Sequence, residues 1–434
     1  MELDGDDGDD LLLGDGSEQR VPRDLVEPDP VYRLAFHPNA PILCTGLMSG
    51  TVNVHEWRRS ETRPVASIET HRGAVCAMEF TRSGSHLATV SSDRHIKVLD
   101  CASQKHVIDI KRKNSPHKDP LSCLSVCTST ELAVGDDDGM VSFWDMRQQK
   151  PVTTFLEHAD QVTGMIYFEG NQQLVTCSTD TTVGCFDMRM QKVAGFSEKR
   201  KDELNCITFL PATNSIIAGT DVGSLPIWKY GAWKRPYDVH AKHPRECDSL
   251  LTYNDNMFFS GGYDGTVRLI QHYPVRRVLT NFGSSRRNFN TVSGISVSHD
   301  RTLLASATMG STVFFYDIEF LGQEAELDKL RDRAERKHME TIRKATAEDR
   351  IPDPDSSDSD SWSADSSDAN DQSDDGGAAS GRPMARDETL DRTTKRERMA
   401  ASRWLKTAQK ERINFAKETR KKRVKSFWTG LLEE

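Results

Sequence analysis

Apolar and polar residues alternate over short segments through most of the chain, and this period of two predicts β-strands. One clear example runs from Gly135 to Arg147, where the Asp-rich segment Asp136–Gly139 leads into an apolar stretch that ends in Trp-Asp. Asp folds its side chain back onto the local backbone and Gly tolerates a positive φ, so this composition favours a tight turn. We therefore predict two antiparallel strands joined by that turn.

The same hairpin recurs along the chain at a nearly constant spacing. Each copy has an apolar register mark three positions before the residue that ends its strand: Val52, Ile96, Val141, Val183, Leu225, Val267 and Val313. Successive marks are 42 to 46 residues apart. A period of about 40–45 residues is typical of four-stranded propeller blades. Four marks have an acid three positions earlier, which we assign to the blade turns: Asp93, Asp138, Asp180 and Asp264.

These repeats resemble the WD-repeat family over residues 31–320. The resemblance implies an all-β fold, a seven-bladed β-propeller that we place at residues 21–320. The last repeat ends near Phe320 without an outer fourth strand, and Leu25-Val26 could supply it. A ring closed by strands from both ends of the chain would have no exposed sheet edge.

In WD-repeat proteins a His joins a Ser or Thr, the turn Asp and the Trp in a buried hydrogen-bond network. The resemblance implies two such sets here: His71, Ser91 and Asp93, and His158, Ser178 and Asp180. The residues at the Trp position of these repeats, Leu99 and Phe186, cannot donate a hydrogen bond. A His–Asp–Ser set could also be a catalytic triad, but its recurrence with the blades indicates a structural role.

The segments outside the repeats have a different composition. Residues 1–20 carry seven acids before Glu18 and no base before Arg20, which predicts a disordered acidic tail. Residues 321–350 predict a charged helix that either packs on the side of the propeller or stands in solvent. Residues 351–391 are an acidic, Ser-rich linker that we expect to be disordered. Ser357, with Asp360 three residues later, is a candidate phosphorylation site in that linker.

The sign of the charge reverses in residues 392–434. Fourteen Lys or Arg stand against three Glu between positions 392 and 425, although the whole chain has a net charge of −9. The bases of the two compact clusters are Lys395, Arg396, Arg398, Arg420, Lys421, Lys422, Arg423 and Lys425. Dense Lys and Arg suit phosphate backbones and import receptors, so we expect a tail that binds rRNA or directs nuclear import. A solvated basic tail is the alternative.

Three segments and the acidic-then-basic tail narrow the resemblance to the family of WD repeat-containing protein 55. The segments are Val31–Pro38, the turn Gly261–Gly265 and the last repeat, Thr291–Phe320. That family is nucleolar and serves rRNA production and assembly of the large ribosomal subunit. The resemblance therefore implies a non-catalytic scaffold in the nucleolus and nucleus, with pre-ribosomal proteins as partners of the propeller.

A second resemblance concerns the ends of two predicted strands. Trp144-Asp145-Met146-Arg147 matches the Trp-Asp-x-Arg box of WD-repeat substrate receptors of cullin-4 ubiquitin ligases, and Phe186-Asp187-Met188-Arg189 is an imperfect copy. The resemblance assigns contact with the ligase adaptor to Asp145, Arg147, Asp187 and Arg189. The same residue types are common at propeller strand ends for structural reasons. A third alternative is a histone tail bound by Asp136–Asp138.

Several function classes lack support in the sequence. There is no phosphate loop, no His-Glu-x-x-His and no paired-Cys metal site, so we expect no enzymatic activity, no cofactor and no small-molecule substrate. The nine cysteines include no Cys-x-x-Cys pair and lie mostly in strand patterns, which predicts reduced, buried thiols in an intracellular protein. The acidic start does not resemble a secretory signal, and no apolar run is long enough for a membrane helix.

Overall fold

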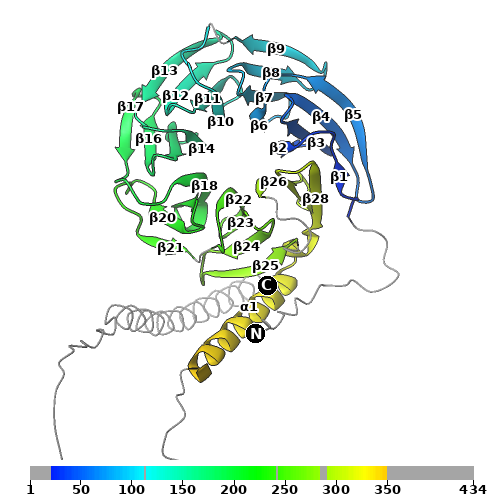
Figure 1. The fold of residues 1–434 in the computed structure, drawn as a ribbon, viewed down its shortest axis with the longest axis vertical. Helices are drawn as coiled ribbons and strands as arrows, with labels where there is room; N and C mark the ends of the chain where they lie inside the picture. The colour runs from blue at the N-terminus through cyan, green and yellow to red at the C-terminus, as the bar shows by residue number, and fades with distance from the viewer. Residues whose placement is uncertain (1–20, 112–113, 241–242, 284–290, 349–434) are drawn as a thin grey trace, which may run out of the picture. The chain divides into compact units, whose positions relative to one another are not determined.

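The computed structural model describes residues 21–111, 114–240, 243–283 and 291–348 (Figure 1). Within these residues the strands form seven four-stranded antiparallel sheets arranged as a ring. The predicted seven-bladed β-propeller is therefore confirmed. Its first strands surround the centre of the ring and its fourth strands lie on the outside.

Blades 1 to 6 each consist of four consecutive strands. Blades 1 to 3 contain β2 (Val31–Phe36), β3 (Ile42–Leu47), β4 (Thr51–Trp57) and β5 (Thr62–Glu69); β6 (Val75–Phe80), β7 (His86–Ser91), β8 (Ile96–Asp100) and β9 (Lys105–Ile110); and β10 (Leu121–Val126), β11 (Glu131–Asp136), β12 (Met140–Asp145) and β13 (Lys150–Leu156). Blades 4 to 6 contain β14 (Val162–Phe168), β15 (Gln173–Ser178), β16 (Val183–Asp187) and β17 (Lys192–Phe196); β18 (Leu204–Leu210), β19 (Ser215–Thr220), β20 (Leu225–Lys229) and β21 (Asp238–His240); and β22 (Cys247–Asn254), β23 (Met257–Gly262), β24 (Val267–Gln271) and β25 (Arg277–Phe282).

Blade 7 is assembled from both ends of the propeller sequence. Its strands are β26 (Val292–Val297), β27 (Leu303–Thr308), β28 (Thr312–Asp317) and, on the outside, β1 (Leu25–Val26). Leu25 pairs with Val313 and Val26 with Thr312, so the predicted closure of the ring is confirmed. The backbone N–H of Glu27 extends this contact with a 2.7 Å hydrogen bond to the carbonyl of Ser311.

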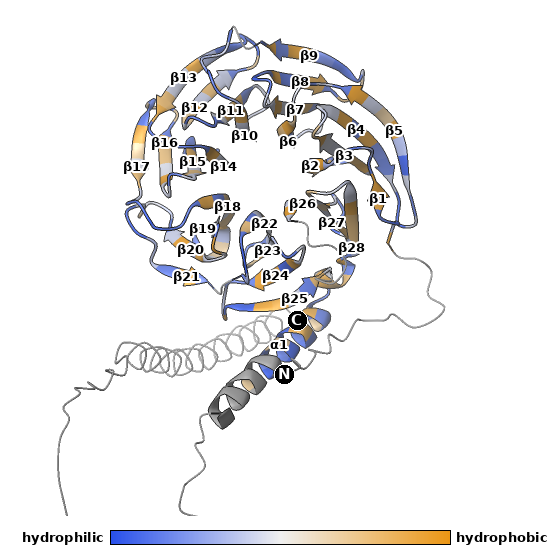
Figure 2. Ribbon diagram, viewed as in Figure 1, coloured by the Kyte–Doolittle hydropathy of each residue, from blue (hydrophilic) through white to orange (hydrophobic). Residues whose placement is uncertain are grey.

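The hydrophobic core lies within and between neighbouring blades. All seven register marks fall in the third strand of a blade, and none is more than 1% exposed. One core cluster shows how adjacent blades meet, because it combines Val90 and Ile96 of blade 2 with Leu132 and Trp144 of blade 3. Figure 2 shows hydrophobic residues recurring on strands all around the ring. Each blade therefore buries its apolar residues partly against the next one.

The turn that first revealed the repeat shows why Gly is required there. Gly139 has a φ of +84°, and a Cβ at this position would lie 2.4 Å from the carbonyl oxygen of His158 in the following loop. No side chain fits in that space, so the turn between β11 and β12 can touch the next blade only because residue 139 is Gly.

The predicted charged helix is present as α1 (Glu324–Glu348), after the short 3₁₀ helix η3 (Glu319–Gly322). Leu327, near its start, is 9% exposed and packs in the core cluster of blades 6 and 7, with Leu330 beside it. The Arg277 side chain of β25 donates a 2.8 Å hydrogen bond to the carbonyl of Arg331. Of the two expected alternatives, packing on the side of the propeller is correct for the first turns of the helix.

Candidate interaction surfaces

The antiparallel strands bring the connections of every blade to two ends of the ring. The upper face, as we name it, carries the turns between second and third strands, such as Asp137–Gly139, and the loops that enter the next blade, such as Glu157–Gln161. The lower face carries the remaining turns, such as Met146–Gln149 between β12 and β13. Candidate site residues from the sequence fall on both faces.

Blade 3 contains a complete His–Asp–Ser–Trp network beneath the upper face. The Nδ1 atom of His117 lies 2.7 Å from a carboxylate oxygen of Asp136, and Nε2 contacts the hydroxyl of Ser142. That hydroxyl also accepts a 2.7 Å hydrogen bond from the indole N–H of Trp144. All four residues are at most 2% exposed. The sequence-based sets did not include this network.

The structure corrects the turn assignment in this blade from Asp138 to Asp136. Strand β11 extends through Asp136, whose carboxylate turns inward and accepts the backbone N–H groups of Asp138 at 3.1 Å and Met140 at 2.8 Å. Asp138 itself is exposed at the tip of the turn. Counting back from Val141 therefore selected the wrong member of three consecutive aspartates.

Blade 2 has a related network around His71, with a different hydroxyl from the one expected. His71 Nε2 lies 2.9 Å from Thr89 Oγ1, and Nδ1 lies 3.3 Å from the Asp93 carboxylate. Ser91 is not the partner of the ring, because its oxygen accepts the backbone N–H of Asp93 at 3.1 Å. Burial alone would raise the pKa of Asp93, but hydrogen bonds from His71 and from the Arg72 N–H hold it well below its usual range.

Blade 4 repeats this arrangement around His158. Its Nε2 lies 2.7 Å from Thr176 Oγ1 and its Nδ1 lies 3.1 Å from Asp180, while Ser178 accepts the backbone N–H of Asp180 at 3.0 Å. Here too the hydroxyl partner is a Thr and not the predicted Ser. Thr176 and the blade 2 equivalent, Thr89, are at most 1% exposed, so neither hydroxyl meets a substrate at the surface. The sets are structural.

Blade 6 confirms the position of Asp264 in its turn and adds an unexpected cation. Asp264 accepts the Thr266 N–H at 3.2 Å and pairs with both terminal nitrogens of Arg268. Burial opposes the charge on Asp264, yet Arg268 holds the pKa of that carboxyl below its ordinary value. The same guanidinium lies 3.0 Å from Nδ1 of His243, whose Nε2 reaches Ser260 at 2.7 Å.

In blade 1 a carboxylate takes the place that His holds in blades 2, 3, 4 and 6. Glu27, directly after β1, accepts hydrogen bonds from Thr45 at 2.6 Å, Asn53 at 2.7 Å and His55 at 2.8 Å. Glu27 is 5% exposed. Burial would raise its pKa, but these three donors together lower it, so the carboxylate stays ionised inside the blade. Glu27 stands four residues before β2, the same spacing that His71 and His158 have from their blades, and this spacing is the sequence signal that could have found it.

On the lower face, the first Trp-Asp-x-Arg box is folded onto itself. The Asp145 carboxylate accepts the backbone N–H of Arg147 at 2.9 Å and its side-chain nitrogens at 3.1 and 3.2 Å. These bonds lower the pKa of Asp145 to about 2. The Arg147 side chain is 70% exposed, whereas that of Asp145 is 9% exposed. Asp145 therefore shapes the turn and holds an Arg that remains accessible.

The second box does not reproduce this arrangement. Asp187 accepts the backbone N–H of Met190 at 2.8 Å, one residue later than in the first box. Arg189 is exposed and forms no ion pair with Asp187 within the described residues. The two boxes are thus alike in sequence but present different side-chain geometry on the lower face.

Comparison with known proteins gives these features a family context. The model of the WDR55 family matches residues 22–321, from just before β1 into η3. The chain belongs to the WDR55 family. The match covers the whole propeller, so the resemblance found in the sequence is confirmed. Residues 1–21 and 322–434 lie outside the matched range.

Individual members of the WDR55 family are similar over a comparable length. The WD repeat-containing protein 55 homolog of Drosophila persimilis is 26% identical over 300 residues, which cover 69% of this chain and 58% of the fly protein. Human WD repeat-containing protein 55 is 26% identical over 300 residues, which cover 69% of this chain and 77% of the human protein. The match therefore spans less than two thirds of the fly relative.

The described part of this WDR55-family chain has neither a metal-binding cluster nor a membrane-spanning helix, and its cysteines are free. It contains no group of three or more His, Cys, Asp or Glu that could hold a metal ion. No helix among the described residues is long and apolar enough to cross a membrane. All nine cysteines are free, and seven of them are buried. Burial raises the pKa of the Cys76 thiol to about 11, which keeps it protonated.

Several predicted features lie outside the described residues. They are the acidic tail at residues 1–20, the linker at 351–391 with Ser357, and the basic tail at 392–434 with its two clusters from Lys395 to Arg398 and from Arg420 to Lys425.

Proposed function

We propose that this protein is a non-catalytic scaffold in nucleolar ribosome biogenesis, with a role in rRNA production and large-subunit assembly. The observation that carries the proposal is the WDR55-family match over the complete propeller, residues 22–321. The candidate catalytic sets support a scaffold, because their hydroxyls are buried and serve the blades. The propeller would bind pre-ribosomal proteins through its two faces of loops and turns.

The basic tail supplies retention in this proposal. Its clusters at Lys395–Arg398 and Arg420–Lys425 would bind the phosphates of rRNA, largely without sequence preference and with steep salt dependence. The acidic linker, with nine Asp and no base between residues 353 and 375, competes for the same cations. It would suppress weak RNA contacts until a pre-ribosomal particle displaces it. Phosphorylation at Ser357 would strengthen this competition.

Deletion of residues 392–434 tests the role of the tail. The truncated protein should leave nucleoli while its melting temperature stays unchanged. Replacement of only Arg420, Lys421, Lys422 and Arg423 by Ala should disperse the protein in part. A truncated protein that stays nucleolar and still sediments with large-subunit precursors at raised salt would show that the propeller alone carries the targeting.

One observation favours a second function, as substrate receptor of a cullin-4 ubiquitin ligase. Arg147 is 70% exposed on the lower face while Asp145 fixes it through two side-chain hydrogen bonds. A pre-oriented, accessible guanidinium is suited to a polar contact with a ligase adaptor. Asp187 and Arg189 lack that pairing, so we assign them at most a lesser part.

A further inference from the structure

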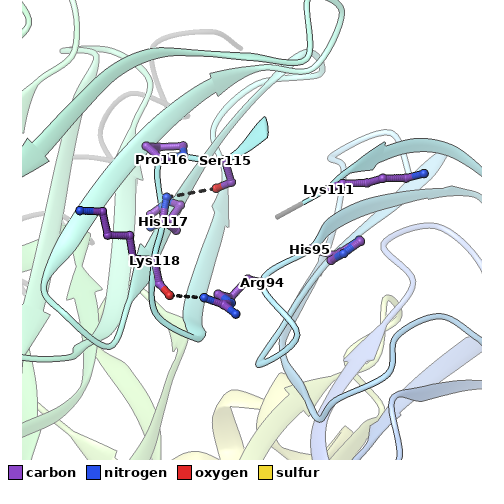
Figure 3. A pocket seen from close by; sticks show the side chains of 7 residues that line it. All are labelled: Arg94, His95, Lys111, Ser115, Pro116, His117 and Lys118. Atoms are coloured by element: carbon purple, nitrogen blue, oxygen red, sulfur yellow. Dashed lines mark hydrogen bonds between the residues drawn. The ribbon is translucent and has the colours of Figure 1, made fainter. Parts of the chain in front are cut away.

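An open pocket of about 700 Å³ lies on the upper face where blades 2 and 3 meet (Figure 3). Two segments line it, the β7–β8 turn and the β9–β10 loop. Its lining residues are Arg94, His95, Lys111, Ser115, Pro116, His117 and Lys118. None of them is acidic, and three carry a fixed positive charge. The pocket therefore has the charge and the size of a site for an anionic ligand.

Within the residues that the structure describes, the three cations of the pocket are not neutralised by carboxylates, and one of them, Arg94, is held by a hydrogen bond. Arg94 has a φ of +67°, and its guanidinium donates a hydrogen bond to the backbone carbonyl of Lys118, as Figure 3 shows. Lys111 and Lys118 are both exposed. Among the described residues, none of these three side chains forms an ion pair with a carboxylate. Most guanidinium donors of Arg94 and the ammonium groups remain available to a ligand.

Three carboxylates that contact lining residues are engaged within the blades, and the first, Asp93 beside Arg94, accepts the N–H of His95 at 3.0 Å and that of Arg72 at 2.9 Å. The second, Asp109, has an oxygen 2.9 Å from the His95 Nδ1 atom. The third, Asp136 beside His117, is 1% exposed and bound within the blade 3 network. None of the three forms a hydrogen bond with the side chain of Arg94, Lys111 or Lys118 in the described part of the chain. Ser115 adds a hydroxyl to the same rim, where its oxygen accepts the N–H of His117 at 3.3 Å.

Immediately beyond Lys118 the surface changes sign. Asp119 continues the same loop, and the Asp137 N–H donates a 3.0 Å hydrogen bond to the carbonyl of Pro120, so the acidic turn touches the basic loop. Burial, together with the charges of Asp136, Asp119 and Asp160, raises the pKa of Asp137. With exposed Asp138, these acids form a negative patch beside the positive pocket.

We propose that the pocket binds the phosphoryl group of a phosphoserine or phosphothreonine in a protein segment whose next residues are Lys or Arg. A phosphoryl group offers three strong acceptor oxygens, which match the forked guanidinium and the two ammonium groups. The basic residues of the segment would lie over Asp119, Asp137 and Asp138. An RNA backbone fits this surface poorly, because its successive phosphates would meet the acidic patch. The inference deepens the proposed function by naming the chemistry of a partner of the propeller.

Fluorescence polarisation with the full chain tests the proposal. The probe is a short labelled peptide with a central phosphoserine followed by lysines. Its companions are the same peptide with unmodified Ser, and a phosphoserine peptide with Gln in place of each Lys. The pocket variant is Lys111→Gln with Lys118→Gln. The matched control is Lys150→Gln with Lys192→Gln, which removes two exposed lysines at the starts of β13 and β17 on the lower side.

The phosphorylated, Lys-containing peptide should bind most tightly. The pocket variant should weaken its binding at least about tenfold, and the control variant should leave it unchanged. Asp138→Asn should weaken the binding of the phosphoserine peptide with lysines, but not the binding of the phosphoserine peptide with Gln in their place. All variants should keep the melting temperature of the parent, because the replaced side chains are exposed.

Three results would overturn the proposal. Equal binding of the phosphorylated and unmodified peptides would show that the pocket does not recognise phosphate. An unchanged affinity in the pocket variant would place the binding elsewhere, for example on the basic tail. Loss of polyuridine RNA binding in that variant, without any phosphopeptide binding, would assign the pocket to RNA. Phosphopeptide binding is measured with the purified protein, so a failure of nucleolar retention in cells would not affect this inference. Likewise, absence of phosphopeptide binding would not affect the proposed nucleolar role.

Discussion

The Glu27 carboxylate accepts a hydrogen bond from Nε2 of His55 at 2.8 Å, although the two residues belong to opposite sides of the ring closure. Glu27 follows β1, the outer strand of blade 7, and His55 lies in β4 of blade 1. Both are at most 5% exposed. The pair therefore fastens the first blade to the segment that completes the last one.

Glu27→Ala should destabilise the propeller by about 2 to 4 kcal/mol, because it leaves three buried donors on Thr45, Asn53 and His55 without an acceptor. Urea unfolding at neutral pH measures the change. The matched control is Glu157→Ala, which removes an exposed carboxylate from a loop and should shift the free energy of unfolding by less than about 0.5 kcal/mol. Equal stability of the two variants would mean that the closure does not depend on Glu27.

The corrected turn of blade 3 offers a matched pair of substitutions within one segment. Asp136→Ala should cost about 2 to 4 kcal/mol, since His117 and two backbone N–H groups lose a buried acceptor. Asp138→Ala changes an exposed residue and should have little effect. Thermal unfolding of both variants measures the difference. A larger decrease in melting temperature for Asp138→Ala than for Asp136→Ala would contradict the blade 3 network.

The sequence predicted the repeat well because its signal is strong and local. Val141 and the six equivalent marks must be apolar in every blade, since each is buried in a third strand. Even the thin strand Leu25-Val26 could be placed, because a ring with one incomplete blade needs a fourth strand. These inferences depend only on the period and on the need to cover sheet edges.

The buried polar networks were harder to predict because their partners are distant in sequence or shifted in register. Glu27 stands in the place of the expected His, four residues before β2, but it is a residue of another type and follows a strand of blade 7. His117 stands four residues before β10, as His71 does before β6, but the acid that pairs with it, Asp136, lies two residues earlier than the repeat predicts. Thr89 and Ser91 lie on the same face of β7, two residues apart, so alternation does not separate them; the Ser91 oxygen instead accepts the backbone N–H of Asp93. Spacing places the residue before each first strand, but it does not say which hydroxyl or carboxylate pairs with it.

Acid should weaken the protein through buried histidines before the turn aspartates are protonated. Burial and the nearby Arg268 lower the pKa of His243 to about 4, with Asp264 opposing them. An unfolded His titrates near pH 6.5, so the folded state binds the proton less well than the unfolded state. The stability contributed by neutral His243 is therefore complete above about pH 6.5 and is lost as the pH falls toward 4.

Between pH 7 and pH 5, the free energy of unfolding should fall by about 2 kcal/mol less in His243→Gln than in the parent protein, because the variant lacks the titrating imidazole. Urea unfolding of parent and variant at both values gives the difference directly. The comparison is needed because Asp248, whose pKa burial and Glu246 raise to about 6, acts in the opposite direction as acid is added. Identical pH dependence in the two proteins would show that His243 does not titrate as described.

The ligase hypothesis predicts that the two Trp-Asp-x-Arg boxes contribute differently to adaptor binding. Arg147→Ala should abolish co-purification of the cullin-4 adaptor without changing the melting temperature, because this exposed guanidinium is the pre-oriented one. Arg189→Ala, an exposed Arg in the second box, is the control and should retain most of the adaptor. Adaptor binding that survives Arg147→Ala would exclude the first box as the contact.

Affinity purification of the tagged full chain from cells, with and without RNase, tests the central claim most directly. We predict that proteins of large-subunit precursors co-purify, and that a subset bound by the propeller remains after RNase removes the contacts of the basic tail with rRNA. Recovery of the cullin-4 adaptor without any pre-ribosomal protein would contradict the proposed role in ribosome biogenesis.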